Sequence, residues 1–297
     1  MIERVLLSSS TLQGHRREID ALATSANGAC VVSASGKGQM KMWDACSGAC
    51  VRELGGHAGD VYSLAMTPDD DFIASGATDG WVKLWDAHTG ACIRTYKGHT
   101  DTVLAVALSR GGARLVSGSA DDCLKLWDTK TGTCLRTFKG HKEEVSCVGL
   151  SVDGTRIVSG SFDKSVRMWD AASGACLRVF RGHRGSVTSL ALSADGARLL
   201  TGSIDAAVKL WDAASGACVC TLLGHAEPVT SVAMSMEGTY AVSGSEDKTV
   251  KLWAAASGVC LRTLEVRPAR VPRPFALLLP PSPFSYLRRL TPRPPPQ

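Results

Sequence analysis

Residues 98–139 read GHTDTVLAVALSRGGARLVSGSADDCLKLWDTKTGTCLRTFK, and this stretch predicts the fold of the chain. It opens on a Gly-His pair, carries a Trp-Asp pair in its second half, and is followed at once by the next Gly-His pair. The pattern recurs every 42 residues without insertion or deletion. Such self-similarity at a period of about 40 to 45 residues is typical of repeat architectures, so six tandem units are predicted. The repeated residues are His15, His57, His99, His141, His183 and His225, with Trp43, Trp85, Trp127, Trp169, Trp211 and Trp253.

Each unit is predicted to form four short strands separated by turns. In residues 98–139 the first strand follows the Gly-His loop and carries Val103 and Val106 among small residues, as buried strands do. The second strand contains residues 115–117, the third alternates apolar and charged residues over 124–127, and the fourth opens at Cys134. The turn between the first two strands requires a residue with positive φ. The residues at this turn are Gly28, Asp70, Gly112, Gly154, Gly196 and Gly238.

The same repeat accounts for many of the eleven cysteines. Six of them open the fourth strand of successive units, namely Cys50, Cys92, Cys134, Cys176, Cys218 and Cys260. The start MIERVLLSSS lacks the basic run and apolar segment of a signal peptide, so a disulfide framework is not expected. Cys46 with Cys50, and Cys218 with Cys220, lack a second ligand pair at zinc-finger spacing. We therefore predict that the six repeated cysteines are small, buried, reduced thiols, and that the chain binds no metal and no cofactor.

The recurring order of Gly-His, a Gly-containing turn and Trp resembles the WD-repeat family over about residues 12–264. The resemblance implies an all-β propeller, a ring of six four-stranded blades around a central channel. It also implies a hydrogen-bonded tetrad that locks each blade, made of a loop His, a Ser or Thr of the second strand, an Asp of the tight turn and the Trp of the third strand. The matching sets are His57, Ser75, Asp79, Trp85; His99, Ser117, Asp121, Trp127; His141, Ser159, Asp163, Trp169; His183, Thr201, Asp205, Trp211; and His225, Ser243, Asp247, Trp253.

The two end units depart from this family pattern. The first has Lys37 where the others have Asp, beside His15, Ser33 and Trp43, so its blade is predicted to lack the lock. The sixth has Ala254 where the others have Asp after Trp. Terminal units of repeat proteins are commonly atypical, so both departures fit the ends of an array.

One domain is predicted over residues 1–266, with six units from His15 to Leu264 preceded by an N-terminal strand. Residues 11–15 match residues 95–99, so the chain begins with a fourth-strand segment that has no unit of its own. Residues 267–297 form a Pro/Arg-rich segment, predicted to be disordered; ten of the chain's twelve prolines follow Leu264 and cannot donate to a strand ladder. Two interpretations stay open: a six-bladed ring with a tail, or a seven-bladed ring truncated where the reading frame is lost.

The charge distribution argues against nucleic-acid binding. The formal charge is +5, but six arginines and only Glu265 as an acid follow Leu264, so the repeat region is about neutral. A neutral repeat region offers no basic face for phosphates. The apolar run at residues 275–279 is too short to cross a bilayer. We therefore expect no membrane association and a cytoplasmic or nuclear location.

The recurrence of His, Ser and Asp raises the question of a nucleophilic triad. A working triad needs one strained, accessible serine beside an oxyanion site, whereas this set is repeated in five units. The motifs GxxxxGK[ST], HExxH and GxSxG are absent from the sequence. We therefore predict that these residues are architectural and that the chain is not an enzyme.

The predicted function is that of a scaffold which binds peptides or partner proteins on the propeller rim within a larger complex. Trp81, Phe162 and Ile204 replace small or polar residues at rim positions and are candidate contact residues, together with Arg16 and Arg184. Charges of both signs on this rim suit protein partners. The alternative is a substrate-recognition subunit of an enzyme complex such as a ubiquitin ligase. The Arg that some family members use for that docking is replaced by Cys46, His88, Lys130, Ala172 and Ala214.

Overall fold

The computed structural model describes residue 12 and residues 14–265, and these form 24 β-strands. The strands make six separate four-stranded antiparallel sheets, which we call blades 1 to 6 in chain order. Blades 1 to 3 comprise β1 (Ile19–Thr24), β2 (Cys30–Ser35), β3 (Gln39–Asp44), β4 (Cys50–Leu54); β5 (Val61–Met66), β6 (Phe72–Ala77), β7 (Val82–Asp86), β8 (Cys92–Tyr96); and β9 (Val103–Leu108), β10 (Arg114–Ser119), β11 (Cys123–Asp128), β12 (Cys134–Lys139). Blades 4 to 6 comprise β13 (Val145–Leu150), β14 (Arg156–Ser161), β15 (Ser165–Asp170), β16 (Cys176–Arg181); β17 (Val187–Leu192), β18 (Arg198–Ser203), β19 (Val208–Asp212), β20 (Cys218–Leu222); and β21 (Val229–Met234), β22 (Tyr240–Ser245), β23 (Thr249–Ala254), β24 (Val259–Glu265).

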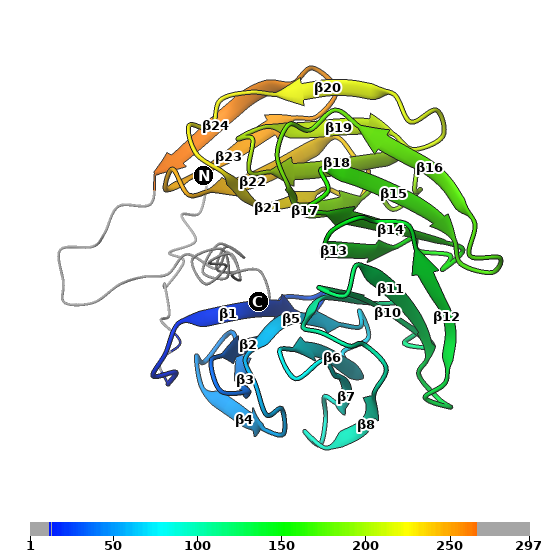
Figure 1. The fold of residues 1–297 in the computed structure, drawn as a ribbon. Helices are drawn as coiled ribbons and strands as arrows, with labels where there is room; N and C mark the ends of the chain where they lie inside the picture. The colour runs from blue at the N-terminus through cyan, green and yellow to red at the C-terminus, as the bar shows by residue number, and fades with distance from the viewer. Residues whose placement is uncertain (1–11, 13, 266–297) are drawn as a thin grey trace, which may run out of the picture.

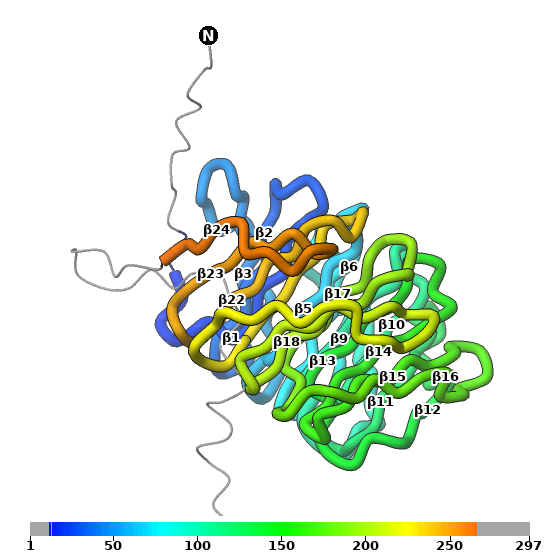
Figure 2. Tube along the Cα trace, turned by 90° about the horizontal axis from the view of Figure 1, so that it is seen from above, coloured from blue at the N-terminus to red at the C-terminus, as the bar shows by residue number. Residues whose placement is uncertain are grey.

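The blades are arranged around a centre as an all-β six-bladed propeller (Figure 1). In each blade the strands follow chain order from the innermost to the outermost, and successive inner strands from β1 to β21 pack on one another. Figure 2 traces the same succession of blades from blue at β1 to orange at β24 in a view turned by 90°. The predicted fold class is therefore confirmed, and each 42-residue interval of sequence corresponds to one blade.

The turn between the first two strands adopts the backbone conformation that the sequence indicates. Gly112 has φ of 66° and Asp70, the one non-glycine at this position, has φ of 63°. Only a residue without a Cβ, or one such as Asp that tolerates the left-handed region, fits this turn at low cost. This turn sets the register of the hairpin, in which Leu115 lies opposite Leu108.

The core is divided into layers between neighbouring blades. Between blades 2 and 3, for example, Val82, Leu84 and Tyr96 pack against Val103 and Trp127. Equivalent clusters join each of the other four neighbouring pairs, from blades 1 and 2 to blades 5 and 6. Within residues 14–265 no such cluster joins blade 6 to blade 1, and the arc of blades is open at this point (Figure 1). The stability of each blade therefore depends on its immediate neighbours.

The prediction of buried thiols at the repeated cysteine position is wrong. All six of these cysteines are exposed, because each opens the outermost strand of its blade, where no further strand covers it. In blade 3, for example, Cys134 lies opposite Trp127, but its Sγ contacts only the outer-strand carbonyl of Arg136 and the hydroxyl of Thr137. Cys147 on the inner strand β13 is partly buried, and this burial raises the pKa of its thiol to about 12. The described cysteines are all free.

Candidate functional site: the blade tetrads and the channel mouth

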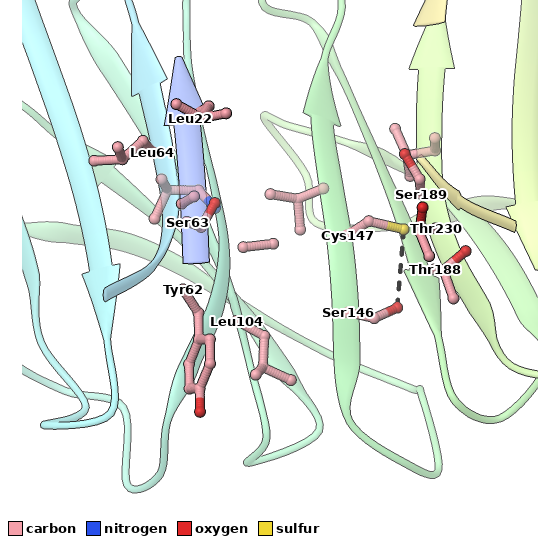
Figure 3. A pocket seen from close by; sticks show the side chains of 15 residues that line it. Leu22, Tyr62, Ser63, Leu64, Leu104, Ser146, Cys147, Thr188, Ser189 and Thr230 are labelled. Atoms are coloured by element: carbon pink, nitrogen blue, oxygen red, sulfur yellow. Dashed lines mark hydrogen bonds between the residues drawn. The ribbon is translucent and has the colours of Figure 1, made fainter. Parts of the chain in front are cut away.

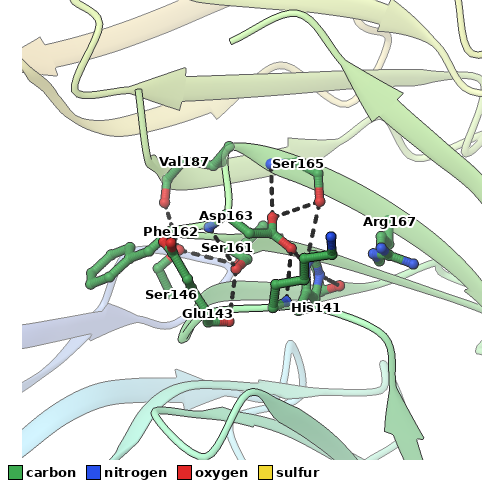
Figure 4. Close-up of polar contacts among 12 residues, drawn as sticks. His141, Glu143, Ser146, Ser161, Phe162, Asp163, Ser165, Arg167 and Val187 are labelled. Atoms are coloured by element: carbon green, nitrogen blue, oxygen red, sulfur yellow. Dashed lines mark hydrogen bonds and ion pairs between the residues drawn. The ribbon is translucent and has the colours of Figure 1, made fainter. Parts of the chain in front are cut away.

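Blade 4 contains a network of polar side chains between its strands (Figure 4). His141 precedes β13, Ser159 lies on β14, Asp163 in the following turn and Trp169 on β15. The Trp169 indole N–H donates to Ser159 Oγ at 2.9 Å, and the Ser159 hydroxyl lies 2.8 Å from His141 Nε2. His141 Nδ1 lies 2.9 Å from Asp163 Oδ2. When the His141 imidazole carries its proton on Nδ1, each donor in this series of hydrogen bonds meets an acceptor, as buried polar groups require.

Asp163 also holds the backbone on both sides of its turn. Its Oδ2 accepts from the Lys142 amide at 3.1 Å, and its Oδ1 accepts from the amide and hydroxyl of Ser165 at 2.9 and 2.6 Å. Burial by itself would raise the pKa of the Asp163 carboxyl. The hydrogen bonds from His141 and Ser165 outweigh burial and hold this pKa well below its usual range.

The structure brings together the corresponding four residues in blades 2, 3, 5 and 6. The distance from His Nδ1 to Asp Oδ2 is 2.9, 2.8, 3.0 and 2.8 Å, and the distance from His Nε2 to the Ser or Thr hydroxyl is 2.7, 2.7, 2.8 and 2.7 Å. Burial lowers the pKa values of His57 and His225, which favours the neutral imidazole. In Asp247 burial opposes the hydrogen bonds from Thr249 and His225, but these prevail and lower the pKa to about 2.

Blade 1 keeps only part of this network. His15 Nε2 lies 2.6 Å from Ser33 Oγ, which also accepts from the Trp43 indole at 2.7 Å. His15 Nδ1 is buried and has no hydrogen-bond partner among the described residues. The Lys37 amide, in place of the missing carboxylate, donates to Asp60 Oδ1 of blade 2 at 2.6 Å. Burial, with the neighbouring Lys41 charge, lowers the pKa of His15.

The serine of the blade 4 tetrad is not accessible to a substrate. Ser159 is completely buried, and its hydroxyl is engaged by both His141 and Trp169. A nucleophilic serine must reach a substrate carbonyl and needs an oxyanion site beside it. Among the described residues no group of three or more His, Cys, Asp or Glu side chains could hold a metal ion. No helix in the part of the chain that the structure describes is long and apolar enough to cross a membrane.

The inner strands enclose a central channel with a cavity of about 240 Å³. Figure 3 shows the hydroxyl-bearing side chains of Ser146, Thr188 and Thr230 on one side of it, and Leu22 with Leu64 on the other. All three hydroxyls are used within the fold, because Ser146 donates to the Val187 carbonyl, Thr188 to the Val229 carbonyl and Thr230 to the Gly244 carbonyl.

The channel mouth beside the His-bearing loops is where the inner strands begin. Leu104 lies there, near the start of β9, and is half-buried (Figure 3). Phe162 lies at the same end, because its amide donates to the carbonyl of Glu144, which directly precedes β13. The Phe162 carbonyl accepts from Ser186 Oγ, and the Ile204 amide donates to the Ser186 carbonyl. Phe162 and Ile204 are therefore brought together along one arc of the mouth, between blades 4 and 5.

Of the other predicted contact residues, Arg184 lies beside the Ile204 turn, because its amide donates to Asp205 Oδ2 at 2.7 Å, whereas Trp81 and Arg16 lie on blades 2 and 1. Trp81 directly precedes β7 in blade 2, and the Lys97 ammonium lies 4.0 Å from its ring centroid. This is a cation–π contact within the blade, so the Trp81 ring is already partly covered. Arg16 and Arg184 are exposed on the His-bearing loops of blades 1 and 5.

Carboxylates gather around the mouth across several blades. Burial, with the charges of Asp101, Asp122 and Glu143, raises the pKa of Glu144, and its Oε2 is buried without a hydrogen-bond partner in the described chain. In blade 1, burial with the charges of Asp60 and Glu18 raises the pKa of Asp20 to about 6. Among residues 14–265 neither Glu144 nor Asp20 lies within ion-pair distance of a Lys or Arg.

Sequence reasoning missed Leu104 and Asp20 as residues of this mouth. Both occupy one repeat position, which is filled by Tyr62, Leu104, Ser146, Thr188 and Thr230 in the later units and by Asp20 in the first. Comparison of this position across the units would have singled it out, because its chemistry varies while its neighbours are kept. The sequence predicts charges of both signs on the rim, but only the folded chain shows that Glu144 lies near Asp101, Asp122 and Glu143.

Six four-stranded blades, a polar tetrad inside five of them and a channel with a variable mouth define a β-propeller of the WD-repeat class. The profile of the WD40 family, described as WD domain, G-beta repeat, matches residues 7–44, 48–86, 90–128, 132–170, 174–212 and 216–254. The chain therefore belongs to the WD40 repeat family. WD40 propellers are typically non-catalytic and commonly mediate protein binding. A search of curated proteins found no match to this chain.

Proposed function

We propose that this propeller is a protein-interaction scaffold that holds a partner segment at the channel mouth on the side of the His-bearing loops. The observation that carries the proposal is the arrangement of two partly exposed apolar residues, Phe162 and Ile204, whose turns are linked through hydrogen bonds to Ser186. The Phe162 amide also binds the backbone of Glu144, whose Oε2 has no hydrogen-bond partner among the described residues. Apolar groups surrounded by polar ones are typical of protein-binding surfaces. The tetrads contribute by keeping the blades, and therefore the mouth, rigid.

The charges at the mouth indicate the chemistry of the partner segment. Asp101, Glu143 and Glu144 come from blades 3 and 4, and their proximity raises the pKa of Glu144 beyond the effect of burial. Like charges that crowd together without cations are relieved when a positively charged group arrives. The proposed partner therefore brings a Lys or Arg beside an apolar side chain that contacts Phe162 and Ile204. In the assembled complex the propeller holds such segments of other subunits.

Affinity purification of the tagged chain from its native cells tests the apolar part of the proposal. The double variant Phe162→Ser with Ile204→Ser should lose at least one partner by about tenfold or more, since a contact residue at the centre of an interface contributes about 2 kcal/mol or more. The matched control is Leu135→Ser with Leu177→Ser, two exposed apolar residues on the outer strands of blades 3 and 4. If the control loses the same partners, or the mouth variant keeps them all, the proposal is wrong.

The charge at the mouth is tested separately with two equivalent glutamates. Glu143→Lys in blade 4 should weaken the partner's binding, whereas Glu227→Lys, at the same repeat position in blade 6, should leave it unchanged. The loss for Glu143→Lys should shrink at high salt, because screening weakens interactions between exposed charges. Equal losses for the two variants would show that the location of the charge at the mouth is irrelevant.

A further inference from the structure

Blade 1 lacks a carboxylate at a position where each of the other five blades has one. In blades 2 to 6 the Asp of the tight turn accepts through Oδ2 from His Nδ1 and from the amide of the residue that follows this His. The amides that donate to Oδ2 are those of Ala58, Thr100, Lys142, Arg184 and Ala226, at 3.1, 3.1, 3.1, 2.7 and 3.1 Å. Oδ1 accepts from the amide two residues beyond the Asp. Five copies of one site therefore show that this position suits a carboxylate.

Two buried polar atoms of blade 1 lack a partner at the corresponding position. Among the described residues nothing accepts from His15 Nδ1, and neither Glu18 nor Asp20 of the same blade does so. Ser35 is 1% exposed, and its Oγ also has no hydrogen-bond partner within residues 14–265. In blades 3 to 6 the serine at this position accepts from the amide of the tetrad Asp at 3.0–3.2 Å. Buried polar groups without partners are destabilising, so the site favours a ligand that supplies the missing acceptor.

The backbone of the turn explains why blade 1 does not complete its own tetrad. Pairing of β2 with β3 continues to Ser35 and Gln39, one pair further than in the other blades. The Lys37 amide donates to Asp60 Oδ1 of blade 2 instead of to Ser35. The Gln39 side chain lies near His15 but not within hydrogen-bonding distance of its Nδ1. Blade 2 therefore holds the turn in a conformation that brings no acceptor to His15.

Unpaired cations surround this part of blade 1. Arg16 follows the histidine of the loop, and Lys37 occupies the Asp position of the turn. A Cβ added to Gly36 would lie 3.3 Å from Arg17 Cδ, so this arginine lies beside the turn as well. All three cations are exposed, and in residues 14–265 none lies within ion-pair distance of a carboxylate. Asp60, an acid beside the turn, already binds the Lys37 amide. The free cations therefore favour a negatively charged ligand.

A carboxylate suits this position better than a water molecule does. A water molecule can accept from the His15 N–H, but it carries no charge to complement the free cations. A carboxylate has acceptors on two oxygens and forms stronger, charge-assisted hydrogen bonds. A free small carboxylate binds weakly at a solvent-facing position of this kind. An acidic side chain on a segment that makes further contacts binds more tightly, because the second contact becomes intramolecular.

We propose that the His-bearing loop and the tight turn of blade 1 bind a carboxylate, which an Asp or Glu side chain of a separate partner protein supplies. This carboxylate accepts from His15 Nδ1 and from the Arg16 amide, as Asp163 accepts from His141 and Lys142 in blade 4. The partner thereby completes the tetrad of blade 1. The site takes an anion, whereas the proposed partner at the channel mouth brings a cation, so the two sites are independent.

NMR spectroscopy of the full-length chain with ¹⁵N-labelled histidines tests whether the site binds a carboxylate. Sodium formate should shift the ring nitrogen signals of His15 saturably, relative to sodium chloride at the same ionic strength. The signals of His99, whose tetrad has its own carboxylate, should shift at least tenfold less. Equal shifts for the two histidines would overturn the proposal. A His15 signal that matches that of His99 before formate is added, and then stays unchanged, would overturn it too, because the chain itself would supply the carboxylate.

A carboxylate introduced into the turn should block the site. In the variant Lys37→Asp the response of His15 to formate should disappear, because the new side chain competes for the same donors and repels an anion. Lys37→Asn is the matched control, since it has nearly the same size without the charge and should keep most of the response. If the Asp variant responds as strongly as the Asn variant, formate binds elsewhere and the assignment of the site is wrong.

Affinity purification from the native cells tests the source of the carboxylate. Lys37→Asp should lose at least one partner by tenfold or more relative to Lys37→Asn. Lys248→Asp, in the equivalent turn of blade 6, should lose none relative to Lys248→Asn, because that tetrad is complete. If formate binds to the isolated chain but no partner depends on Lys37, the site takes a free carboxylate and the proposed protein source is wrong.

The partner's own acidic residue provides the last part of the test. A photo-crosslinking amino acid at position 37 should join a partner segment that contains Asp or Glu, and replacing that residue with its amide should weaken binding at least tenfold. Crosslinks only to segments without an acidic residue would overturn the proposal. The double variant Phe162→Ser with Ile204→Ser should keep this partner, so that failure at blade 1 is distinguished from failure of the proposed function.

Discussion

At the scale of single residues, the repeated His, Ser and Asp side chains form a directed chain of hydrogen bonds. In blade 4 the indole of Trp169 donates to Ser159, Ser159 to His141, and His141 to Asp163. Each donor meets an acceptor only when the imidazole is neutral and carries its proton on Nδ1. The network therefore ties two strands, β14 and β15, to two loops, and its stability depends on the Asp163 carboxylate and on pH.

Replacing the Asp of a complete tetrad should lower the free energy of unfolding, whereas replacing Lys37 at the same position of blade 1 should hardly change it. Asp163→Ala leaves the His141 N–H and the amides of Lys142 and Ser165 without their acceptor, and should lower the free energy of unfolding by roughly 3 kcal/mol. Lys37→Ala at the same repeat position removes no such bond and should change it by less than about 0.5 kcal/mol. Urea denaturation of both variants measures the difference. Similar losses of unfolding free energy in the two variants would mean that the tetrad carboxylate does not stabilise the blade.

The depressed pKa values of two tetrad histidines, His57 and His225, predict a loss of stability in mild acid. Burial lowers the pKa of His57 and His225, so the unfolded chain binds protons near its ordinary pKa of about 6.5 while the folded chain does not. The free energy of unfolding should therefore be greatest above about pH 6.5 and fall as the pH is lowered to about 5.5.

Urea denaturation at several pH values checks this expectation. The variant His225→Gln should show a shallower dependence than the native chain, since one of the titrating groups is gone. A second decline is expected below about pH 4, because the pKa of Asp247 is lowered to about 2 and its contribution is lost as pH falls through that value. A free energy of unfolding that stays constant between about pH 7.5 and 5.5 would contradict the assignment of neutral histidines.

At the scale of strands, the second strand of each blade is shaped by its approach to the next blade. A Cβ added to Gly118 on β10 would lie 2.7 Å from Val145 Cγ1 and 2.8 Å from Val148 Cγ1. The equivalent Gly160 and Gly202 are equally close to the following blade. Blade 1 has Ala34 at this position, so its interface with blade 2 is packed differently. The glycine therefore reflects close packing between sheets and not a special backbone conformation.

Gly118→Ala should destabilise the protein by roughly 1–3 kcal/mol, because the added methyl group overpacks the interface between blades 3 and 4. Gly111→Ala is the control, since a Cβ there meets nothing within 4 Å and the change should be nearly neutral. Thermal unfolding of the two variants measures the contrast. If the midpoint temperature of thermal unfolding is unchanged for Gly118→Ala, the interface between blades 3 and 4 accommodates the methyl group without loss of stability.

At the scale of the whole molecule, the propeller is a linear array bent into an arc. Blades 2 to 5 each share a core layer with two neighbours, whereas blades 1 and 6 share one. In such arrays stability is close to a sum of unit and nearest-neighbour contributions. The two end blades are therefore the least supported parts of the described structure.

Hydrogen exchange should follow this gradient. Amides of β22 and β23 in blade 6 and of β2 and β3 in blade 1 should exchange faster than those of β10 and β11 in blade 3, which occupy the same repeat positions. Mass spectrometry of peptides from each blade measures the difference in the isolated chain. Uniform protection around the molecule would indicate that blades 1 and 6 are joined in solution.

Much of the fold and part of the candidate site follow from local patterns. The 42-residue period, the positive-φ position at Gly112 and the members of each tetrad are all visible in the sequence, because each depends on residues within one repeat. The exposure of Cys134 was predicted wrongly. Alternation along a strand shows that a residue faces one side of a sheet, but not whether anything covers that side.

The sequence by itself determined the six 42-residue units, their strands and the residues of the tetrads, since these arise from interactions inside a unit or between adjacent units. Only the tertiary structure decided that the turns of Phe162 and Ile204 are neighbours at the mouth, that Glu144 lies near other carboxylates, and that Val242 is partly exposed at an open edge. These features depend on which faces of different blades come together. Such proximity is a property of the curvature of the whole arc, and no single 42-residue unit encodes it.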